Sequence, residues 1–499
     1  MLNLINRRIE SIKFLVFSCV PFLYLYKIAF FILLPMTVFA PQGITVLTLI
    51  LAVIFFLDMY TSFSLKYIFQ KNGKLLLLTG IFLMFSFCTS FWSITREESF
   101  KEVLRITILF LAGYSVFRGL QRTSYQTEII KSLWAGWVVT VVLLCIEAIT
   151  GGLIASFMKQ SLVAMYKYNK STSVMVLFLI PLFLLKKKYL IIEKKESIFF
   201  GKKLEIAIFI LFIGTIFTLV SGASKLALIG GIILPFALYI LPQKMRKLFL
   251  QIIVCFYFIG VFIIPNIYAI PTIKQYSFKM VKSNSFYDRI SIWENVRNIA
   301  LNKSENMQGS TCRTFFGFGL GSSKAEVFSK QRCAWQMPPS SLLSDKSSLK
   351  ENNFLYKLRK YLGSLRVVDQ NAQTKNAQTK NAQNSSLELK FGQCNNSGIT
   401  VPIYKYPLAV TEVIPLHPHN NVLQITLELG FVGIFLFFLM IQLCIQGIWE
   451  LNSTPRYLCM LSGTLISFLI ISSISYGIWQ SWWVCTLWLV LSVSQRIRS

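Results

Sequence analysis

Long apolar segments recur along this chain of 499 residues and restrict its fold more than any other feature. A helix needs about 20 apolar residues to cross the hydrocarbon core of a bilayer. The sequence predicts twelve such helices, at roughly 14–34, 42–60, 75–92, 102–119, 129–149, 171–185, 204–220, 225–241, 248–265, 422–445, 457–475 and 477–494. The last two share one apolar run that is too long for a single crossing, so we expect a tight hairpin there. The predicted fold class is an all-α polytopic membrane protein.

The composition agrees with this fold class. Hydrophobic residues make up 54% of the chain, charged residues only 14%, and the mean hydropathy is +0.58. A soluble chain has about 25% charged residues and a disordered chain has low hydrophobicity, so both classes are excluded. Lys and Arg nevertheless outnumber Asp and Glu by 50 to 21, which gives a net charge of +29. In a membrane protein this excess indicates topology first, and we expect no nucleic-acid partner.

The distribution of Lys and Arg predicts the orientation of the helices. With the N-terminus inside, the inner connections and termini hold 22 basic residues, whereas the short outer connections hold six. This split follows the positive-inside rule, so we expect both termini in the cytoplasm. The first apolar segment is too long for a cleavable signal peptide and lacks a small-residue cleavage site.

One outer connection is much longer than the others and divides the membrane domain. Residues 1–265 hold about nine segments and 422–499 hold about three, with a large loop at 266–421 between them. Within that loop, residues 371–383 repeat a polar NAQTK unit without an apolar stripe. We therefore expect 337–400 to be a mostly disordered insertion.

The loop begins with a predicted amphipathic helix at 282–301. Apolar residues recur at three- and four-residue steps from Phe286 to Ala300, which places them on one helix face. Arg289 and Arg297 lie near that face, eight residues apart. The pattern alone favours a helix that lies on the membrane with its arginines on lipid phosphates.

Cysteines and glycines suggest local structure in the middle of the loop. Of Cys312, Cys333 and Cys394, two can form a disulfide in an oxidising compartment, and we favour Cys312–Cys333. The sequence FGFGLG at 316–321 resembles a dinucleotide-binding loop, but it has no strand before it and no βαβ unit after it. We therefore expect no nucleotide cofactor, and favour a tight turn whose backbone N–H groups face an anion.

The only two histidines of the chain, His417 and His419, stand directly before the segment 422–445. Histidine can transfer a proton near neutral pH, although a single histidine is more often structural. Two histidines at this spacing could also bind a metal, but no Cys or carboxylate is spaced to complete such a site. A polar cluster at the start of a membrane helix is unfavourable unless it is used, so we favour proton transfer and expect no metal.

Charged residues also fall inside the apolar segments. Arg105 and Glu147 both lie near the outer ends of their segments and could form an ion pair, whereas Lys27 has no obvious partner. The sequence leaves open whether these three line a functional cavity or pair for structural reasons.

A group of cations shares one predicted depth in the outer leaflet. Lys225 begins the segment 225–241, where the simplest interpretation is a side chain that reaches toward the interface. Arg105 and Arg289 can lie at the same depth, beside His419. Several fixed cations and one histidine suit a lipid-linked phosphate or diphosphate substrate.

At this point the residues resemble a known family. His419-Asn420, followed by nine residues and then by Gly430-Phe-Val-Gly433, resembles the histidine signature of bacterial O-antigen ligases. The resemblance extends to the large outer loop directly before the histidine, including its Asp288-Arg-Ile-Ser-Ile-Trp helix and its FGFGLG turn. It also includes the Ser221-Gly-Ala-Ser-Lys start of a segment.

This resemblance implies a fold similar to GT-C glycosyltransferases, in which many membrane helices lie below a periplasmic domain. It implies an inverting, metal-independent transfer of a glycan from an undecaprenyl diphosphate carrier to lipid A-core, at the periplasmic face of the bacterial inner membrane, without a cofactor. Besides membrane lipids, the partners would be that donor and that acceptor. The catalytic residues implied are His419 as the base and Arg289 at the diphosphate. Lys225 stands where the family has a second arginine, and it keeps the charge but loses the bidentate geometry.

The remaining candidates for substrate binding are Asn420, Arg297, Arg105 and His417. Two related activities use the same donor and differ in the acceptor: an O-antigen or capsule polymerase and a protein O-glycosyltransferase. A transporter or flippase belongs to another class, and it predicts pseudo-symmetric halves and charges at the midplane. The sequence shows no repeated set of segments, which favours the enzyme.

Overall fold

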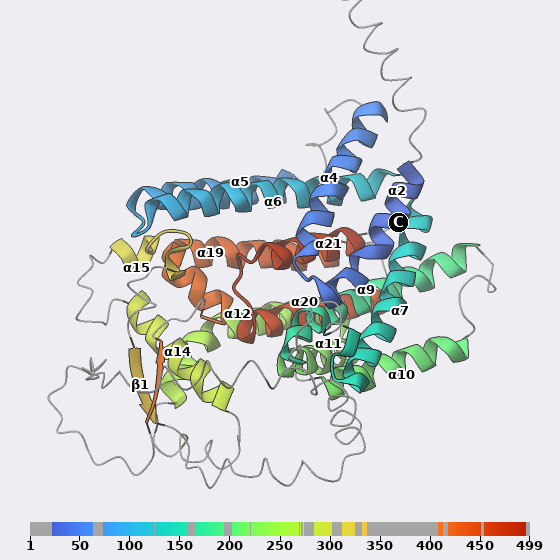
Figure 1. Ribbon diagram of the computed structural model, residues 1–499. Helices are drawn as coiled ribbons and strands as arrows, with labels where there is room; N and C mark the ends of the chain where they lie inside the picture. Colours follow the sequence, from blue (N-terminus) through green and yellow to red (C-terminus); the bar gives the residue numbers. More distant parts are fainter. Residues whose placement is uncertain are drawn as a thin grey trace, which may run out of the picture.

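The computed structural model describes residues 22–62, 73–123, 125–154, 156, 165–193, 202–219, 221–268, 270, 273, 284–301, 312–324, 332–336, 408–412, 418–450 and 454–495. These residues form a bundle of long helices with a smaller group of elements at one end (Figure 1). Each of the twelve predicted apolar segments has a helix at its place.

The long helices of the first part are α2 (Phe22–Leu33), α4 (Gly43–Ser62), α5 (Gly73–Thr89), α6 (Arg96–Arg122), α7 (Gln126–Thr150), α9 (Asn169–Glu193), α10 (Lys202–Thr218), α11 (Gly222–Ile240) and α12 (Gln243–Tyr268). The last part of the chain adds α19 (Asn421–Trp449), α20 (Pro455–Ile474) and α21 (Ser481–Ser494). Short elements join or cap them: α3 (Pro35–Phe39), η2 (Ser90–Trp92), η3 (Met165–Tyr168), α14 (Asn284–Ala300), α15 (Cys312–Phe316) and η5 (Ser322–Lys324).

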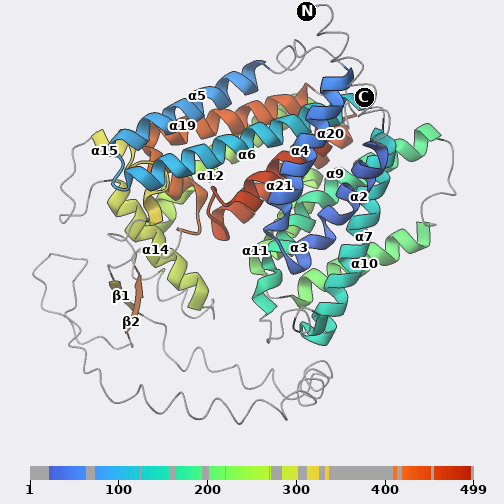
Figure 2. The ribbon, with the colours of Figure 1, turned by 45° about the horizontal axis from the view of Figure 1, so that its top comes forward.

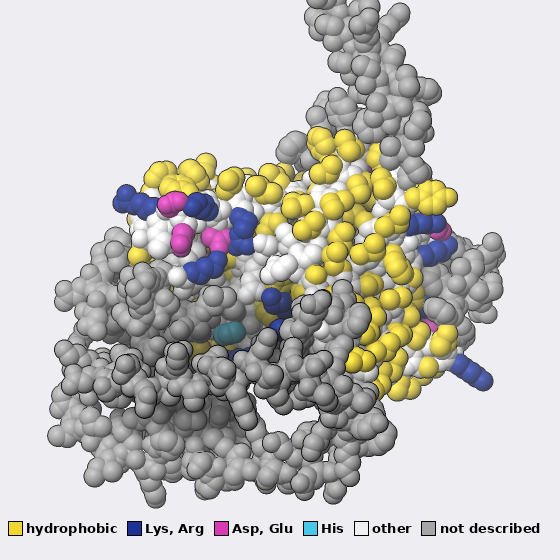
Figure 3. Space-filling model, in the orientation of Figure 1, with side chains coloured by type: hydrophobic (Ala, Val, Ile, Leu, Met, Phe, Trp, Pro, Cys, Tyr) yellow, Lys and Arg dark blue, Asp and Glu magenta, His cyan; other side chains and the backbone are white. Residues whose placement is uncertain are grey.

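The described part of the chain contains nine helices that are long and apolar enough to cross a membrane, besides two shorter apolar helices at Gly43–Asp58 and Ser481–Ser494. Large apolar side chains stay exposed along the bundle, among them Phe236 and Phe256 at 69% each. Figure 3 shows such side chains covering much of the described flank, with the charged side chains in small separate patches. Lipid can cover a surface of this size and water cannot, so the prediction of a helical polytopic membrane protein is confirmed.

Different segments of the chain lie at the two ends of the bundle. The C-terminal end of α21 and the facing ends of α9 and α10 lie toward one end, while α14 and α15 lie toward the other (Figures 1 and 2). Gln121, near the end of α6, hydrogen-bonds Gln495 after α21, which joins two connections predicted to be cytoplasmic. At this predicted cytoplasmic end, Lys27 forms an ion pair at 2.7 Å with Glu128, in the first turn of α7. The sequence had indicated no partner for Lys27.

One small sheet departs from the all-α expectation. Strands β1 (Arg332–Gln336) and β2 (Leu408–Glu412) pair antiparallel, with Arg332 opposite Glu412. They flank the predicted insertion and bring its two sides together. The insertion 337–400 itself, and the side chains of the cysteines in the expected disulfide, lie outside the described residues.

Candidate functional site

The site is built around the start of α19. Asn420 is the N-cap of this helix: its Oδ1 accepts a hydrogen bond from the Leu423 backbone N–H at 3.1 Å. Its amide Nδ2 donates to the Ser473 carbonyl at 3.2 Å, which ties the start of α19 to the end of α20. Asn420 is 1% exposed and both of its amide atoms are bonded within the protein. Its two hydrogen bonds fix the start of α19 directly after His419.

His419 has an unusual backbone conformation and a fixed ring. Its φ of 54° lies in the left-handed region, which few residues other than glycine adopt. Ring atom Nδ1 lies 2.8 Å from the carbonyl oxygen of Ser475, between α20 and α21. A carbonyl only accepts, so Nδ1 carries the proton and Nε2 carries the lone pair of the neutral ring. Burial lowers the pKa of His419, the Ser475 carbonyl opposes this, and the charge of Arg289 lowers it further. The ring is thereby kept neutral and able to accept a proton.

Arg289 lies near His419 and is carried by α14. Its charge acts on the pKa of His419 and also on that of Tyr476, which burial raises and the Arg289 charge lowers. The apolar face of α14, with Ile290, Trp293 and Val296 buried, packs against α12 and α19. The helix is thus fixed to the bundle, whereas the pattern alone favoured a helix lying on the membrane.

A cluster of buried hydroxyl groups connects Tyr476 to the start of α11. The Tyr476 hydroxyl lies 3.2 Å from the Ser173 Oγ, and the Ser173 Oγ lies 3.0 Å from the Ser224 Oγ. Ser221 caps α11, and its Oγ accepts from the Ser224 backbone N–H at 3.3 Å. Lys225 follows directly in the first turn of α11 and is half-buried. The structure therefore brings α9, α11 and the α20–α21 connection together, with a cation at the junction.

Arg105 fixes the same connection from the other side. Its guanidinium donates to the Ser481 Oγ at 2.5 Å and to the Trp479 carbonyl at 2.8 Å, and it pairs with Glu102. Glu147, which the sequence left as a possible partner of Arg105, instead accepts a hydrogen bond from the hydroxyl of Tyr168. Glu102 lies three residues before Arg105 on the same helix, so a local partner replaces the distant one.

Two candidates remain: Arg297 contacts α12, and His417 lies outside the described part of the chain. Arg297 is 6% exposed and donates to Asn266 of α12 and to Asn298 at 3.0 Å, so it joins α14 to α12. The side chain of His417 is not among those that the structure describes.

The glycine-rich turn docks on a break in α19. Gly430 has a φ of +64° and interrupts the helix. The carbonyl groups of Leu427 and Glu428 accept hydrogen bonds from the backbone N–H groups of Phe318 (2.9 Å) and Gly319 (2.8 Å). A Cβ at Gly430 would lie 2.2 Å from the Phe315 carbonyl oxygen. The first glycine after the nine-residue spacing is therefore needed for this docking.

We expected the backbone N–H groups of the glycine-rich turn to face an anion, and in the structure one of them faces a side chain of the protein. The Gly321 backbone N–H donates to the Glu428 carboxylate at 2.8 Å, and the Ser323 hydroxyl donates to it at 2.5 Å. The group that the turn faces is thus a carboxyl side chain of α19 itself. Glu428 was missed in the sequence, where the available signal was a carboxylate inside an apolar segment, one turn after Gln424.

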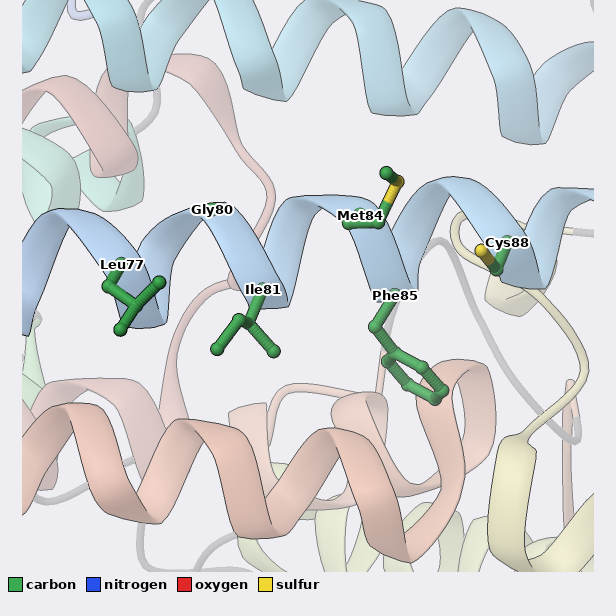
Figure 4. A pocket seen from close by; sticks show the side chains of 6 residues that line it. All are labelled: Leu77, Gly80, Ile81, Met84, Phe85 and Cys88. Atoms are coloured by element: carbon green, nitrogen blue, oxygen red, sulfur yellow. The ribbon is translucent and has the colours of Figure 1, made fainter.

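A shallow apolar pocket lies on the flank of α5 and does not include His419. It is lined by Leu77, Gly80, Ile81, Met84, Phe85 and Cys88 (Figure 4). None of these side chains is charged, so the pocket suits a hydrocarbon chain rather than a diphosphate or a sugar. Figure 3 instead shows a histidine side chain exposed on the described surface with Lys or Arg side chains beside it. Among the described residues, no three His, Cys, Asp or Glu side chains are grouped to hold a metal ion.

Known proteins resemble part of this chain. A protein of Rickettsia conorii named "Putative polysaccharide ligase RC0486" is 37% identical over 86 residues, which are 17% of this chain and 21% of that protein. Proteins named "Putative polysaccharide ligase" from Rickettsia felis and Rickettsia bellii are 38% and 39% identical over 90 residues, with the same two shares. The matches thus span about a fifth of the length of these relatives. No family model and no solved structure matches the chain. Over the matched region the chain is similar to proteins named as polysaccharide ligases, in agreement with its histidine motif.

Proposed function

We propose that this protein is an O-antigen ligase, which transfers a glycan from an undecaprenyl diphosphate carrier to lipid A-core. The observation that carries the proposal is the hydrogen bond from His419 Nδ1 to the Ser475 carbonyl, because it leaves Nε2 of a neutral ring as a proton acceptor beside the charge of Arg289. The relatives named as polysaccharide ligases support the general activity, while the donor and the acceptor are part of the proposal.

His419 acts as the general base. Its Nε2 takes the proton of an acceptor hydroxyl while that oxygen attacks the anomeric carbon of the donor sugar. The new bond forms on the face opposite the leaving group, so the configuration at the anomeric carbon is inverted. Asn420 and Ser475 keep the ring in place during this step.

Arg289 and Lys225 stabilise the leaving group. The bond between the anomeric carbon and the diphosphate oxygen breaks, and undecaprenyl diphosphate leaves with the electron pair. Cations placed where this charge develops lower the barrier. Arg289 lies on α14 and Lys225 on α11, so the two approach the diphosphate from different elements.

The site faces the periplasm of the inner membrane in this proposal, with both termini in the cytoplasm. This orientation rests on the 22 basic residues of the connections and termini assigned to the cytoplasm. Chemistry by a histidine and two cations needs neither metal nor nucleotide, so we expect transfer by the purified protein to continue in EDTA.

Deletion of the gene, followed by gel analysis of lipopolysaccharide, tests the function. For a ligase, lipid A-core loses its polymer while polymer persists on the lipid carrier. Lipid A-core that carries a single repeat unit would identify a polymerase, and unchanged lipopolysaccharide with an unglycosylated target protein would identify a protein O-glycosyltransferase. A transporter would leave the glycan on the cytoplasmic side of the membrane.

His419→Ala tests the mechanism in the same strain. Since general-base catalysis contributes about 100- to 10,000-fold, this variant should reproduce the deletion at a normal level in the membrane. The matched control is Lys244→Ala, an exposed cation at the opposite end of the bundle, which should restore the polymer fully. A His419→Ala variant with full activity would exclude the proposed base.

A further inference from the structure

Glu428 is the centre of a buried cage of hydrogen-bond donors. One carboxylate oxygen accepts from the Ser323 hydroxyl at 2.5 Å and from the Gln424 amide at 3.0 Å. The other accepts from the Gly321 backbone N–H at 2.8 Å and from the Trp479 indole N–H at 2.7 Å. The side chain has no exposed surface. The four donors match the lone-pair sites of the two carboxyl oxygens of Glu428.

Gln424 extends this cage to the connection between α20 and α21. Its Nε2 donates to Glu428, and its Oε1 accepts from the Ile478 backbone N–H at 3.1 Å. Gln424 and Glu428 lie one turn apart on α19 and therefore face the same side. Together they hold two residues of the connection, Ile478 by its backbone and Trp479 by its ring.

The same connection orients His419. Ser475, three residues before Ile478, supplies the carbonyl that binds Nδ1 of the histidine. Glu428 thus bridges the glycine-rich turn and the α20–α21 connection, and that connection fixes the tautomer of the ring. The proposed mechanism uses His419 and leaves Glu428 without a part in the reaction.

We propose that Glu428 is a positioning residue for His419: with Gln424 it anchors the α20–α21 connection, so that the Ser475 carbonyl meets Nδ1 and leaves Nε2 to accept the proton. The kinetic part of this inference rests on the proposed function, whereas the tautomer can be measured without any substrate.

The substitution Glu428→Gln changes the cage without changing its size. An amide placed with its NH2 toward Gly321 and Trp479 would face two N–H groups, which cannot accept. The NH2 must therefore face Ser323 and Gln424. Gln424 then has to turn its carbonyl oxygen toward residue 428, and it loses the hydrogen bond from Ile478.

The double variant Gln424→Glu/Glu428→Gln repairs this defect. The carboxylate introduced at position 424 would again accept from the Ile478 N–H and would also accept from the new amide at position 428. The oxygen of that amide keeps the bonds from Gly321 and Trp479, and the Ser323 hydroxyl can turn to accept. The double variant also keeps one buried carboxyl group, so its stability alone cannot identify a positioning role. The test is therefore whether it restores the orientation and the activity of His419.

Kinetics of the full-length protein in nanodiscs give the first test, with a polyprenyl diphosphate glycan as donor and lipid A-core as acceptor. Misplacement of a catalytic group can reduce turnover up to ~100-fold, so Glu428→Gln should lower kcat by about tenfold or more and leave the KM for the donor within about twofold. The double variant should recover most of kcat. Wild-type kcat in Glu428→Gln, or no recovery in the double variant, would overturn the proposal.

Trp479→Phe provides a second variant in case Glu428→Gln does not accumulate. It removes one donor from the cage and keeps a ring that can pack near Phe82. Like Glu428→Gln, it should lower kcat and change the KM for the donor only a little. A change in KM alone would contradict the positioning role.

Nitrogen-15 NMR of histidine-labelled protein gives the test that is independent of activity. The chain has only two histidines, and His417→Gln removes the other signal from the spectrum. We expect a single Nδ1–H tautomer for His419 in this background, a mixture after Glu428→Gln, and the single tautomer again in the double variant. An unchanged tautomer in Glu428→Gln would overturn the proposal. If the tautomer shifts as expected while no form of the protein transfers glycan, the positioning stands and the proposed ligase activity fails.

Discussion

The two ends of the helix bundle hold their buried polar groups with different partners. At the end predicted to face the cytoplasm, Lys186 is 3% exposed, pairs with Glu205 and lies 4.4 Å from the centre of the Trp134 ring. At the other end, His419 binds the Ser475 carbonyl and Glu428 binds neutral N–H and O–H groups. Lys186 is thus held by a charge of opposite sign, whereas His419 is held by a group without a full charge, although Arg105 and Glu102 form an ion pair at the same end as His419.

This difference matters for chemistry. A carboxylate beside a histidine favours the protonated ring, which can no longer take up a proton. A carbonyl orients the ring just as well and leaves it neutral. The ion pair of Lys186 can therefore serve stability alone, while the neutral partner of His419 keeps a base available. The next three changes test this contrast.

The largest effect on stability is expected for Lys186→Met. It leaves the Glu205 carboxylate without its cation, and breaking a buried pair in this way costs about 3–5 kcal/mol. Thermal unfolding in nanodiscs should show the loss, while glycan transfer per folded molecule stays unchanged. The double variant Lys186→Met/Glu205→Gln should recover much of the stability. Reduced turnover in the folded fraction would mean that the two ends are not separate in function.

A smaller loss of stability, with a loss of activity, is expected for Gly430→Ala. A φ of +64° and the close Phe315 carbonyl disfavour any side chain there, at a cost of about 1–3 kcal/mol. The glycine-rich turn should then dock poorly, so turnover should also fall.

The control for this change is Gly447→Ala on the same helix, where a Cβ would meet no atom within 4 Å. It should be neutral or stabilising by up to about 1 kcal/mol. Equal effects of the two alanines would contradict the docking role of Gly430.

The smallest effect is expected at Lys225, which tests the charges of the site rather than its base. Lys225→Met should raise the KM for the donor about fivefold, as expected for the loss of about 1 kcal/mol of phosphate binding. Lys225→Arg should lower that KM, because a guanidinium can bind a phosphate with two hydrogen bonds. Identical KM values in both variants would remove Lys225 from the diphosphate site.

The sequence predicted those features that are local or are imposed by the membrane. Hydropathy located the apolar helices because lipid leaves no other partner for the backbone, and the motif from His419 to Gly430 lies within one short stretch. The sequence could not show that the α20–α21 connection orients His419, because Ser475 and His419 are 56 positions apart.

Two other residues show where sequence reasoning failed for a physical reason. Glu147 looked like the partner of Arg105 because both were assigned to the outer ends of neighbouring segments, but the packing gives each a different partner. Glu428 was missed, because the donors that surround it come from three separate parts of the chain.

The pH dependence of glycan transfer tests the central claim most directly. Burial lowers the pKa of His419 from its ordinary value of 6.5, so the neutral base should persist as the pH falls to 6.5 and be lost only at lower pH. The unfolded chain binds this proton first, so stability should also begin to fall below pH 6.5. We predict a wild-type kcat/KM, which reports the groups of the free enzyme, that stays level from pH 8 to about 6.5 and then falls with the uptake of one proton. A kcat/KM that already falls with an apparent pKa above 6.5, or that does not fall at low pH, would contradict a neutral His419 as the base.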